Sequence, residues 1–468
     1  MHGIPKLEDR WDADWSDAAA AVQDQVRDLG LRSVRVSFAD QHGLLHGKVL
    51  DAAQIPHALR SGVSFPASLL TKDTGRHYAF SLWEPDGGPT LASVMGARDM
   101  LMVPDPATFR VLPWLDGTGW MLCDLYSVGG APVELSTRRI CAEAHQRLAD
   151  RGLRLRAGLE MEFHLYRVDE SSGDHQRIHP GWDLLAEDYS DQIEPLLEPI
   201  QRHLTALGLP PRTIEAEHGP SQVELTFAPA DGIELADQAV LIRAAVKQIA
   251  RRHGLHATFM SRPTGDDTFT TGWHIHQSVL SAGDGRNLFA PTIPGEALSE
   301  MAMHYLGGLL DHAEESCLLT TPTITGYKRY RPYSIAPDRI VWSRQHRGAM
   351  LRVIDEPPGP ATRIENRAGD PAANPYLYLA SQILSGIDGI DSKHEAPPPS
   401  ETPYEAEAGP LLPRTLGDAI DAFDRSGFYR NTLGDEIVDY LVALKRSEWT
   451  RFGAAVTDWE QREYYATF

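Results

Sequence analysis

The stretch LEMEFHLY, residues 159–166, alternates strictly between apolar side chains and glutamate, histidine or tyrosine. This alternation has the period of a β-strand, so the stretch predicts a strand with one apolar and one polar face. Glu160 and Glu162 then lie on the same face, where neighbouring carboxylates repel each other. We therefore expect the apolar face to join a core and a cation to lie over the polar face.

Three later stretches repeat this separation of charged and apolar side chains: IEAEHGPSQVELTF at 214–227, TGWHIHQS at 271–278 and RIENR at 363–367. The polar residues that stand out in them are Glu217, Glu224, His274, His276, Arg363, Glu365 and Arg367. In a chain with a large core, the polar faces of several strands converge on a cavity. The alternative is that these faces are the solvent side of an antiparallel sheet.

A buried cluster of five glutamates and a histidine requires compensating positive charge, because burying even one unpaired charge costs several kcal/mol. Carboxylates with an occasional imidazole are the ligands typical of Mg²⁺ or Mn²⁺. The nearby arginines have guanidinium groups that bind phosphate or carboxylate oxygens in pairs. The pattern therefore predicts a divalent metal site beside an anion-binding site.

The composition restricts the class of protein. The chain has 468 residues, of which 42% are hydrophobic and 23% charged, as in an ordinary globular protein. Its net charge of −21 argues against nucleic acid or an anionic membrane as the main partner. Three separated cysteines without CxxC spacing, and the lack of a signal peptide or an apolar run of about 18 residues, predict a cytoplasmic protein that does not span a membrane.

Local patterns also predict the order of helices and strands. Residues 16–29 predict a helix, and residues 34–38 and 48–50 predict two strands joined by a turn, as in a small α+β domain. The segments after residue 125 that predict helices are 136–150, 193–207, 237–252, 296–317, 374–386 and 434–447. Those that predict strands, besides residues 159–166, are 221–227, 255–260 and 273–280.

Five further motifs occur in a fixed order: LMVPDPAT at 101–108, YKRY at 327–330, RxxxLRV at 347–353, RIENR at 363–367 and GDPAANPYLYLASQILSGIDGI at 369–390. With these motifs the chain resembles the glutamine synthetase superfamily, type I branch, along nearly its whole length. Among its members, the chain is similar to the γ-glutamyl amide (glutamate–amine) ligases.

The resemblance implies an α+β fold with two domains. Residues 1–125 would form a β-grasp domain. Residues 126–468 would form a catalytic domain with a curved antiparallel sheet flanked by helices. It also implies a homo-oligomer, a dodecamer of two hexameric rings, with active sites between neighbouring subunits.

The resemblance also implies roles for single residues. One metal ion would be held by Glu162, Glu217 and Glu224, and a second by Glu160, His274 and Glu365. The residues expected to bind ATP are His276, Ser278, Arg347, Arg352 and Arg363. Arg329 and Arg367 would bind glutamate, and the catalytic arginines would be Arg347, Arg352 and Arg367.

The implied substrates are ATP, glutamate and an amine, with two or more Mg²⁺ or Mn²⁺ ions in each active site. A carboxylate of glutamate attacks the γ-phosphorus of ATP, and an amine then captures the resulting acyl phosphate. Positioning and electrostatic stabilisation of the transferred group supply most of the catalysis in such a reaction.

Two departures from the family pattern concern the amine. Ammonia-using members have an aspartate and a glutamate where this chain has Pro66 and Ile335. Without them the site lacks both the charge that attracts ammonium and the base that deprotonates it. We therefore expect an organic amine, and Phe65, Pro66, Trp273 and Ile335 favour an apolar or aromatic monoamine.

Other amines stay open as alternatives, namely polyamines, ethanolamine and ammonia itself. A further departure concerns the acyl donor, because Phe269 to Gly272 replace an Asn-Gly-Ser-Gly run that helps to hold the amino end of glutamate. Two different classes of protein also remain as alternatives. One is a non-catalytic structural relative, and the other is a metal hydrolase that uses the same carboxylates.

Overall fold

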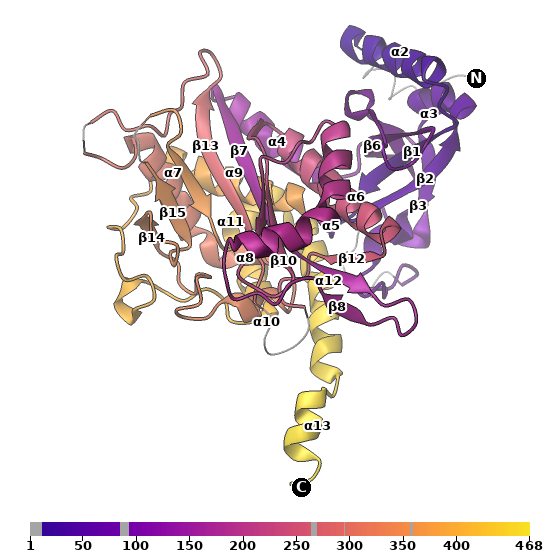
Figure 1. The fold of residues 1–468 in the computed structure, drawn as a ribbon. Helices are drawn as coiled ribbons and strands as arrows, with labels where there is room; N and C mark the ends of the chain where they lie inside the picture. Colours follow the sequence, from indigo (N-terminus) through magenta and orange to yellow (C-terminus); the bar gives the residue numbers. More distant parts are fainter. Residues whose placement is uncertain (1–11, 85–92, 264–268, 294, 356–358) are drawn as a thin grey trace.

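The computed structural model describes residues 12–84, 93–263, 269–293, 295–355 and 359–468. Two β-sheets with helices packed around them form the body of the molecule (Figure 1). Within the described residues, no helix combines the length and the apolar character that crossing a membrane requires.

The smaller sheet is N-terminal and has the order β2-β1-β6-β4-β3, with β5 paired to β6. Its strands are β1 (Ser33–Ala39), β2 (Leu45–Asp51), β3 (Val63–Pro66), β4 (Asp99–Pro104), β5 (Arg110–Val111) and β6 (Thr118–Ser127). The neighbouring helices are α2 (Ala13–Asp28) and α3 (Ile55–Ser61). The predicted helix and hairpin are confirmed, and the carboxylate of Asp40 closes the hairpin turn by accepting the backbone N–H groups of His42 and Leu44 at 2.9 Å.

The two predicted domains share interior contacts. The predicted boundary after residue 125 falls inside β6, which continues to Ser127. Arg138, just beyond this strand, binds Asp105 and Asp124 from the smaller sheet region and Asp237 from the catalytic region, each at 2.8–2.9 Å. The β-grasp assignment and the division into two domains stay predictions.

The larger sheet carries the polar strands and has the order β14-β15-β16-β13-β7-β10-β9, with three short strands also paired to β7. The strands are β7 (Leu153–Val168), β8 (His175–Arg177), β9 (Thr213–Ala216), β10 (Gln222–Thr226), β11 (Ala230–Asp231), β12 (Leu255–Thr258), β13 (Trp273–Ser281), β14 (Trp342–Arg344), β15 (Leu351–Ile354) and β16 (Arg363–Asn366). The predicted antiparallel pairing holds except at the edge, where β14 pairs with β15 in parallel.

Ten helices are described after the smaller sheet: α4 (Thr137–Ala149), α5 (Glu187–Ala206), α6 (Glu234–Arg252), α7 (Glu300–Asp311), α8 (Ala313–Thr320), α9 (Pro375–Ser392), α10 (Leu416–Asp424), α11 (Gly427–Leu433), α12 (Asp435–Ala454) and α13 (Asp458–Tyr464). Helix α9 is buried along most of its length and fixes the sheet from behind. Its Gln382 side chain accepts hydrogen bonds from Gln277 of β13 at 3.0 Å and from Asn366 of β16 at 2.8 Å. These hydrogen bonds fix one face of β13 and β16, and the opposite face of both strands carries the charged side chains.

The single helix predicted over 296–317 is in fact two helices. α7 ends before His312 and α8 begins after it. The His312 ring binds Glu315 at 3.0 Å and Asp388 at 2.8 Å and stacks on Phe428 with ring centroids 3.7 Å apart. These side-chain contacts stabilise the break, which the apolar pattern of the segment does not reveal.

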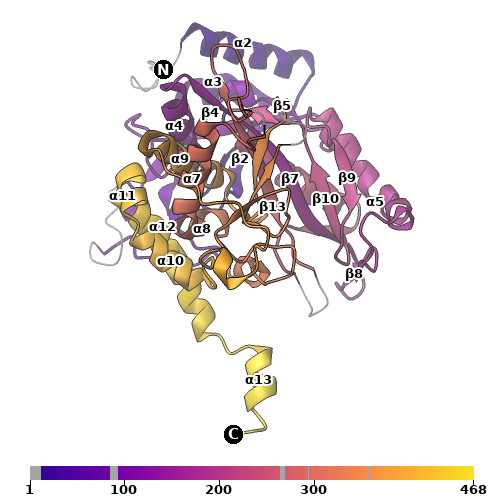
Figure 2. The same cartoon turned by 90° about the vertical axis from the view of Figure 1, so that its left-hand side faces the viewer.

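The C-terminal helix α13 projects away from the body in both views (Figures 1 and 2). It carries Trp459 and Tyr464, and Tyr465 and Phe468 follow it; all four side chains are at least half exposed. Such a group of exposed aromatic side chains on a projecting helix is typical of a surface that another protein chain covers.

Candidate active site

The pairing register of the larger sheet brings the predicted acidic residues into two rows. In the first row Glu162 of β7 lies opposite Glu224 of β10, which lies opposite Glu215 of β9. In the second row Glu160 of β7 lies opposite His274 of β13. Because directly opposed residues in an antiparallel pair share a face, these side chains all point to one side of the sheet.

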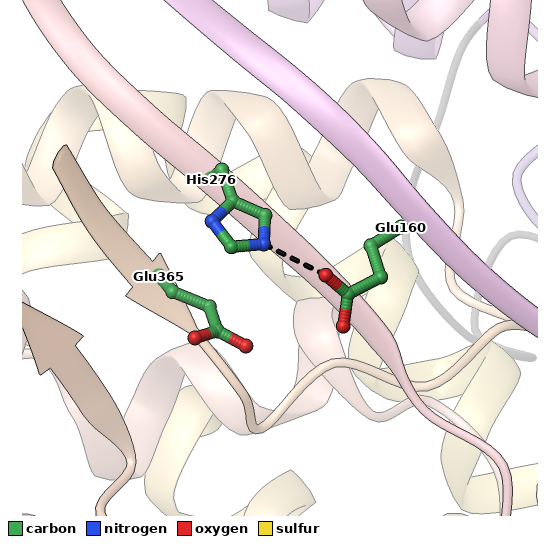
Figure 3. A group of neighbouring side chains, drawn as sticks. All are labelled: Glu160, His276 and Glu365. Atoms are coloured by element: carbon green, nitrogen blue, oxygen red, sulfur yellow. Dashed lines mark hydrogen bonds and ion pairs between the residues drawn. The ribbon is translucent and has the colours of Figure 1, made fainter. Parts of the chain in front are cut away.

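The second row continues across the next two strands, β16 and β15. His276 of β13 lies opposite Glu365 of β16, and Glu365 lies opposite Arg352 of β15. Figure 3 shows Glu160, His276 and Glu365 converging on one space. We call this region the basic half of the site; its residues are Glu160, His274, His276, Arg352, Glu365 and Arg367. The acidic half consists of Glu162, Glu215, Glu217 and Glu224.

In the basic half each carboxylate has cationic or imidazole partners. Glu160 binds His274 Nδ1 at 2.6 Å and His276 Nε2 at 2.9 Å. Burial alone would raise the pKa of Glu160, but these two histidines outweigh it and hold the pKa below its ordinary value. Glu365 accepts hydrogen bonds from Arg367 and, at 3.0 Å, from Arg352. Burial would raise the pKa of Glu365, but the positive charge of Arg367 above all outweighs burial and lowers this pKa to about 2.

In the acidic half the carboxylates lack such compensation. Glu162 is buried and accepts hydrogen bonds from the Gln222 side chain at 2.6 Å and the Gly272 backbone at 2.9 Å. Burial, and then the charge of Glu217, raise its pKa to about 8. Burial and the neighbouring carboxylates, Glu160 first among them, raise the pKa of Glu224 to about 11.

The buried carboxylates of the acidic half, with their raised pKa values, fit a site that is completed by a cation. Three groups of ligand atoms each lie within 4.8 Å of one another: Glu160, His276 and Glu365; Glu160, Glu224 and His274; and Glu215, Glu217 and Glu224. Their oxygen-rich chemistry with one imidazole suits a hard divalent cation. Burial and the nearby Arg367 lower the pKa of His274, which keeps its imidazole in the neutral form that binds metals.

The structure brings the six predicted metal ligands together on one face of the sheet. The grouping differs from the predicted one, because His276 joins Glu160 and Glu365, and Glu215 joins Glu217 and Glu224. Glu215 was not predicted, although it precedes Glu217 by two residues and therefore shares its face of the chain. The assignment of these residues to individual metal ions stays a prediction.

Two of the residues predicted to bind ATP, His276 and Arg352, belong to the basic half itself. Arg363 donates to His276 Nδ1 at 3.1 Å, and Arg352 also binds the Gln345 backbone carbonyl at 3.0 Å. Ser278 follows His276 by two residues on β13 and so shares its face. Arg347 is exposed in the turn between β14 and β15.

Arg329 and Arg367, predicted to bind glutamate, are both buried. Arg329 donates to the backbone carbonyls of Ala368 at 3.1 Å and Gly369 at 2.6 Å. The Nε atom of each arginine is buried without a hydrogen-bond partner among the described residues. The role of the two arginines in binding glutamate stays a prediction.

The prediction that Trp273 lines the amine site is wrong. Trp273 is fully buried, and its ring packs edge-on against Tyr378 with centroids 5.2 Å apart. It lies next to His274 on β13, so it points to the opposite face of the sheet. Phe65 is also a core residue, with its ring 4.6 Å from that of Phe38.

The other two predicted amine-site residues are exposed. Pro66 ends β3 in the smaller sheet, and Ile335 lies in the loop after the YKRY motif with 49% of its surface accessible. In Figure 1, β3 lies on the opposite side of the molecule from β14 and β15. Pro66 therefore belongs to the smaller sheet and not to the sheet that carries the acidic residues, and the contact of Pro66 and Ile335 with the amine stays a prediction.

Comparison with known proteins identifies the family. Residues 134–464 match the model of the glutamine synthetase catalytic domain. The chain belongs to the glutamine synthetase family. This family uses ATP and divalent metal ions, in agreement with the chemistry of the acidic half.

Several family members are similar over almost their whole length. The chain is 40% identical over 486 residues to the γ-glutamylanilide synthase of Acinetobacter sp., covering 97% of each chain. It is 32% identical to a γ-glutamylethanolamide synthetase of Streptomyces coelicolor, covering 92% of each. It is 31% identical to a glutamine synthetase of Halobacterium salinarum, covering 97% of this chain and 98% of the relative.

Solved structures give the same result for the fold. A structure of GmaS in complex with ADP has a TM-score of 0.80 and 27% sequence identity, and covers 95% of this chain and 99% of the other. Apo GmaS has a TM-score of 0.79 with the same identity and coverage. The similarity therefore includes the catalytic sheet and the smaller N-terminal sheet.

Proposed function

We propose that this member of the glutamine synthetase family is an ATP-dependent ligase that joins the γ-carboxylate of glutamate to an organic amine. One observation supports it above all others. Five strands, β7, β10, β13, β15 and β16, bring a row of uncompensated buried carboxylates next to carboxylates paired with histidine and arginine. An acidic half that takes a divalent cation, beside an arginine-rich half that takes phosphate, is the combination that phosphoryl transfer needs.

The reaction has two steps. In the first, a γ-carboxylate oxygen of glutamate attacks the γ-phosphorus of ATP, the bond to the bridging oxygen breaks, and ADP leaves. In the second, the amine nitrogen attacks the acyl carbon, phosphate leaves with the electron pair of the C–O bond, and the nitrogen loses a proton. The overall products are the γ-glutamyl amide, ADP, phosphate and a proton.

The side chains of this protein position and neutralise the reacting groups. Arg352, Arg363 and the exposed Arg347 bind the phosphates, while Arg329 and Arg367 hold the carboxylates of glutamate. Two or more divalent cations, Mg²⁺ or Mn²⁺, when bound by the acidic half and the histidines, supply the charge that stabilises the transferred phosphoryl group. The paired carboxylates Glu160 and Glu365 keep the arginines and histidines oriented in the free protein.

The amine is organic rather than ammonia. Pro66 and Ile335 provide no carboxylate to attract ammonium or to remove its proton. Two of the similar proteins are named as synthases of an anilide and an ethanolamide. A glutamine synthetase activity is the second candidate, because the relative from Halobacterium salinarum bears that name.

The active unit is an oligomer, a dodecamer of two hexameric rings. Pro66 lies on the smaller sheet, outside the sheet that carries the acidic residues, which agrees with an active site formed between neighbouring subunits. The exposed aromatic residues of α13 support assembly, because a projecting apolar surface of this kind is stabilised by a partner.

The test is a phosphate-release assay with ATP, Mg²⁺, glutamate and a panel of amines. We expect an organic amine to stimulate phosphate release far more than ammonium does. Mass spectrometry should then find the matching γ-glutamyl amide. Equal or greater stimulation by ammonium would overturn the organic-amine assignment in favour of glutamine synthetase activity, and no stimulation by any amine would favour a non-catalytic relative.

A further inference from the structure

Three aromatic side chains meet at the edge of the acidic half. The Trp182 ring lies edge-on to His218, with centroids 5.6 Å apart, and edge-on to Phe269 at 6.3 Å. The rings of His218 and Phe269 are themselves 4.8 Å apart. They come from three separate segments of the chain, and we call them the aromatic cluster.

The aromatic cluster is held by an unusual backbone. Trp182 has a φ of 71°, a conformation that a bulky side chain rarely adopts and that is typical of strained functional sites. The preceding Gly181 has a φ of 76°, and a Cβ there would lie 2.4 Å from the backbone nitrogen of Pro220. The backbone N–H of Trp182 donates to the carbonyl of His218 at 2.7 Å. This turn fixes Trp182 against His218 while leaving 53% of the tryptophan exposed.

The aromatic cluster is also connected to the acidic half. His218 directly follows Glu217, whose carboxylate accepts the His218 backbone N–H at 3.0 Å. The next residue, Gly219, donates to the Gln222 side chain at 2.8 Å, and Gln222 donates to Glu162 at 2.6 Å. One short hydrogen-bonded segment therefore joins the three rings to the two carboxylates.

Phe269 packs against the same segment. A Cβ on Gly219 would lie 2.5 Å from the Cβ of Phe269, so the glycine allows the ring to approach. The backbone carbonyl of Thr270 accepts a hydrogen bond from Gln222 at 3.2 Å. Phe269 departs from the family pattern, and this same residue completes the aromatic cluster.

We propose that the aromatic cluster binds the aryl ring of the amine substrate, and that the substrate is a primary aromatic amine of the aniline class. This inference rests on the proposed ligase function. Edge-on rings around a half-exposed tryptophan offer an apolar surface that a further ring can join in the same geometry. An arylamine is neutral at neutral pH, so its nitrogen is nucleophilic without the carboxylates that Pro66 and Ile335 replace.

The test compares aniline with ethanolamine, which has no ring, in the full-length enzyme. We expect Trp182→Ala and Phe269→Ala each to raise the KM for aniline by about tenfold, the upper range for losing one aromatic contact. The kinetic constants for ethanolamine and glutamate should change less than about twofold. Trp182→Phe should keep most of the affinity for aniline.

Leu185→Ala is the matched control. Leu185 lies in the same loop, has a φ of 60° and is 57% exposed, but it has no ring. We expect this variant to behave as the wild type with both amines. The melting temperature and the mass of the assembly should be unchanged in all four variants.

Several results would overturn the inference. If only the KM for glutamate rises, the aromatic cluster binds the acyl donor and not the amine. If the KM rises equally for aniline and ethanolamine, the aromatic cluster only maintains the structure of the site. A change in assembly mass would assign it to a subunit contact. Turnover of another amine but not aniline by the wild type would overturn this inference while the ligase function stands, whereas no turnover with any amine would overturn the ligase function.

Discussion

The acidic half and the basic half of the site lie on neighbouring strands of one sheet, yet their charges are balanced in different ways. In the basic half Glu365 has two arginine partners, and its pKa is lowered to about 2. In the acidic half Glu162 and Glu224 have pKa values raised to about 8 and about 11. Only β7 contributes to both halves, through Glu160 and Glu162.

This difference indicates which part of the site is complete before ligands bind. The basic half is compensated by its own side chains, so removing one of them leaves a buried charge without its partner and destabilises the folded protein. The acidic half is stable at neutral pH only with bound protons or a bound cation. The two carboxylates of LEMEFHLY therefore have different roles, although they are two residues apart.

The largest effect is expected from Glu365→Gln, which breaks the basic half. Phosphate release should fall by about 10³-fold, as when a charged catalytic group is lost. The free energy of unfolding should also fall by about 3 kcal/mol, because Arg367 then lacks its buried partner. Chemical denaturation measures the second effect. A variant as stable as the wild type would show that the basic half is not an internal ion-pair network.

The next effect is expected from Glu224→Gln, which changes the acidic half. Turnover should again fall by about 10²-fold or more, since a carboxylate ligand is lost. In contrast to Glu365→Gln, the metal-free protein should be more stable than the wild type at pH 8, because a buried carboxylate without a partner has been neutralised. Melting curves recorded in the presence of a chelator test this. Destabilisation equal to that of Glu365→Gln would contradict the difference between the halves.

A smaller effect concerns the pH dependence of the metal-free protein. Glu162 has a folded pKa of about 8, above its ordinary value, so its contribution to stability is present at low pH and is lost as the pH rises toward 8. We expect the melting temperature in a chelator to fall by a few degrees between about pH 6 and pH 8. Added Mg²⁺ should reverse most of this fall in melting temperature at pH 8. A melting temperature that rises over this range would contradict the prediction.

The smallest effect on catalysis is expected from Trp273→Phe. This residue lies on the buried face of β13, so the substitution should cost about 1–2 kcal/mol of stability through lost packing. The relative rates with aniline and ethanolamine should stay as in the wild type. A change in amine preference would show that the buried face also affects the amine site.

Sequence reasoning predicted the features that depend on local pattern. Alternation along residues 159–166 and 273–280 identified β7 and β13, and the helix predicted over 136–150 is α4, whose N-cap Ser136 accepts the Arg139 backbone N–H. Family motifs then predicted six metal ligands, and the structure brings these six residues close together.

The features that sequence reasoning missed depend on contacts between distant segments. The spacing of Glu215 from Glu217 indicated a shared face, but the pairing of β9 with β10 is what places Glu215 opposite Glu224. The aromatic cluster joins residues 182, 218 and 269, and no local pattern relates them. Trp273 was assigned to the amine site by its aromatic character, although its position beside His274 already indicated the opposite face of the strand.

Titration calorimetry of Mg²⁺ binding to the nucleotide-free protein tests the central claim, that the acidic half is completed by a divalent cation. Measured at pH 7 in two buffers with different ionisation enthalpies, binding should release about one proton or more, because Glu162 and Glu224 have pKa values above 7. Glu224→Gln should bind more weakly and release fewer protons. Binding without proton release, and with the same affinity in wild type and Glu224→Gln, would contradict the claim.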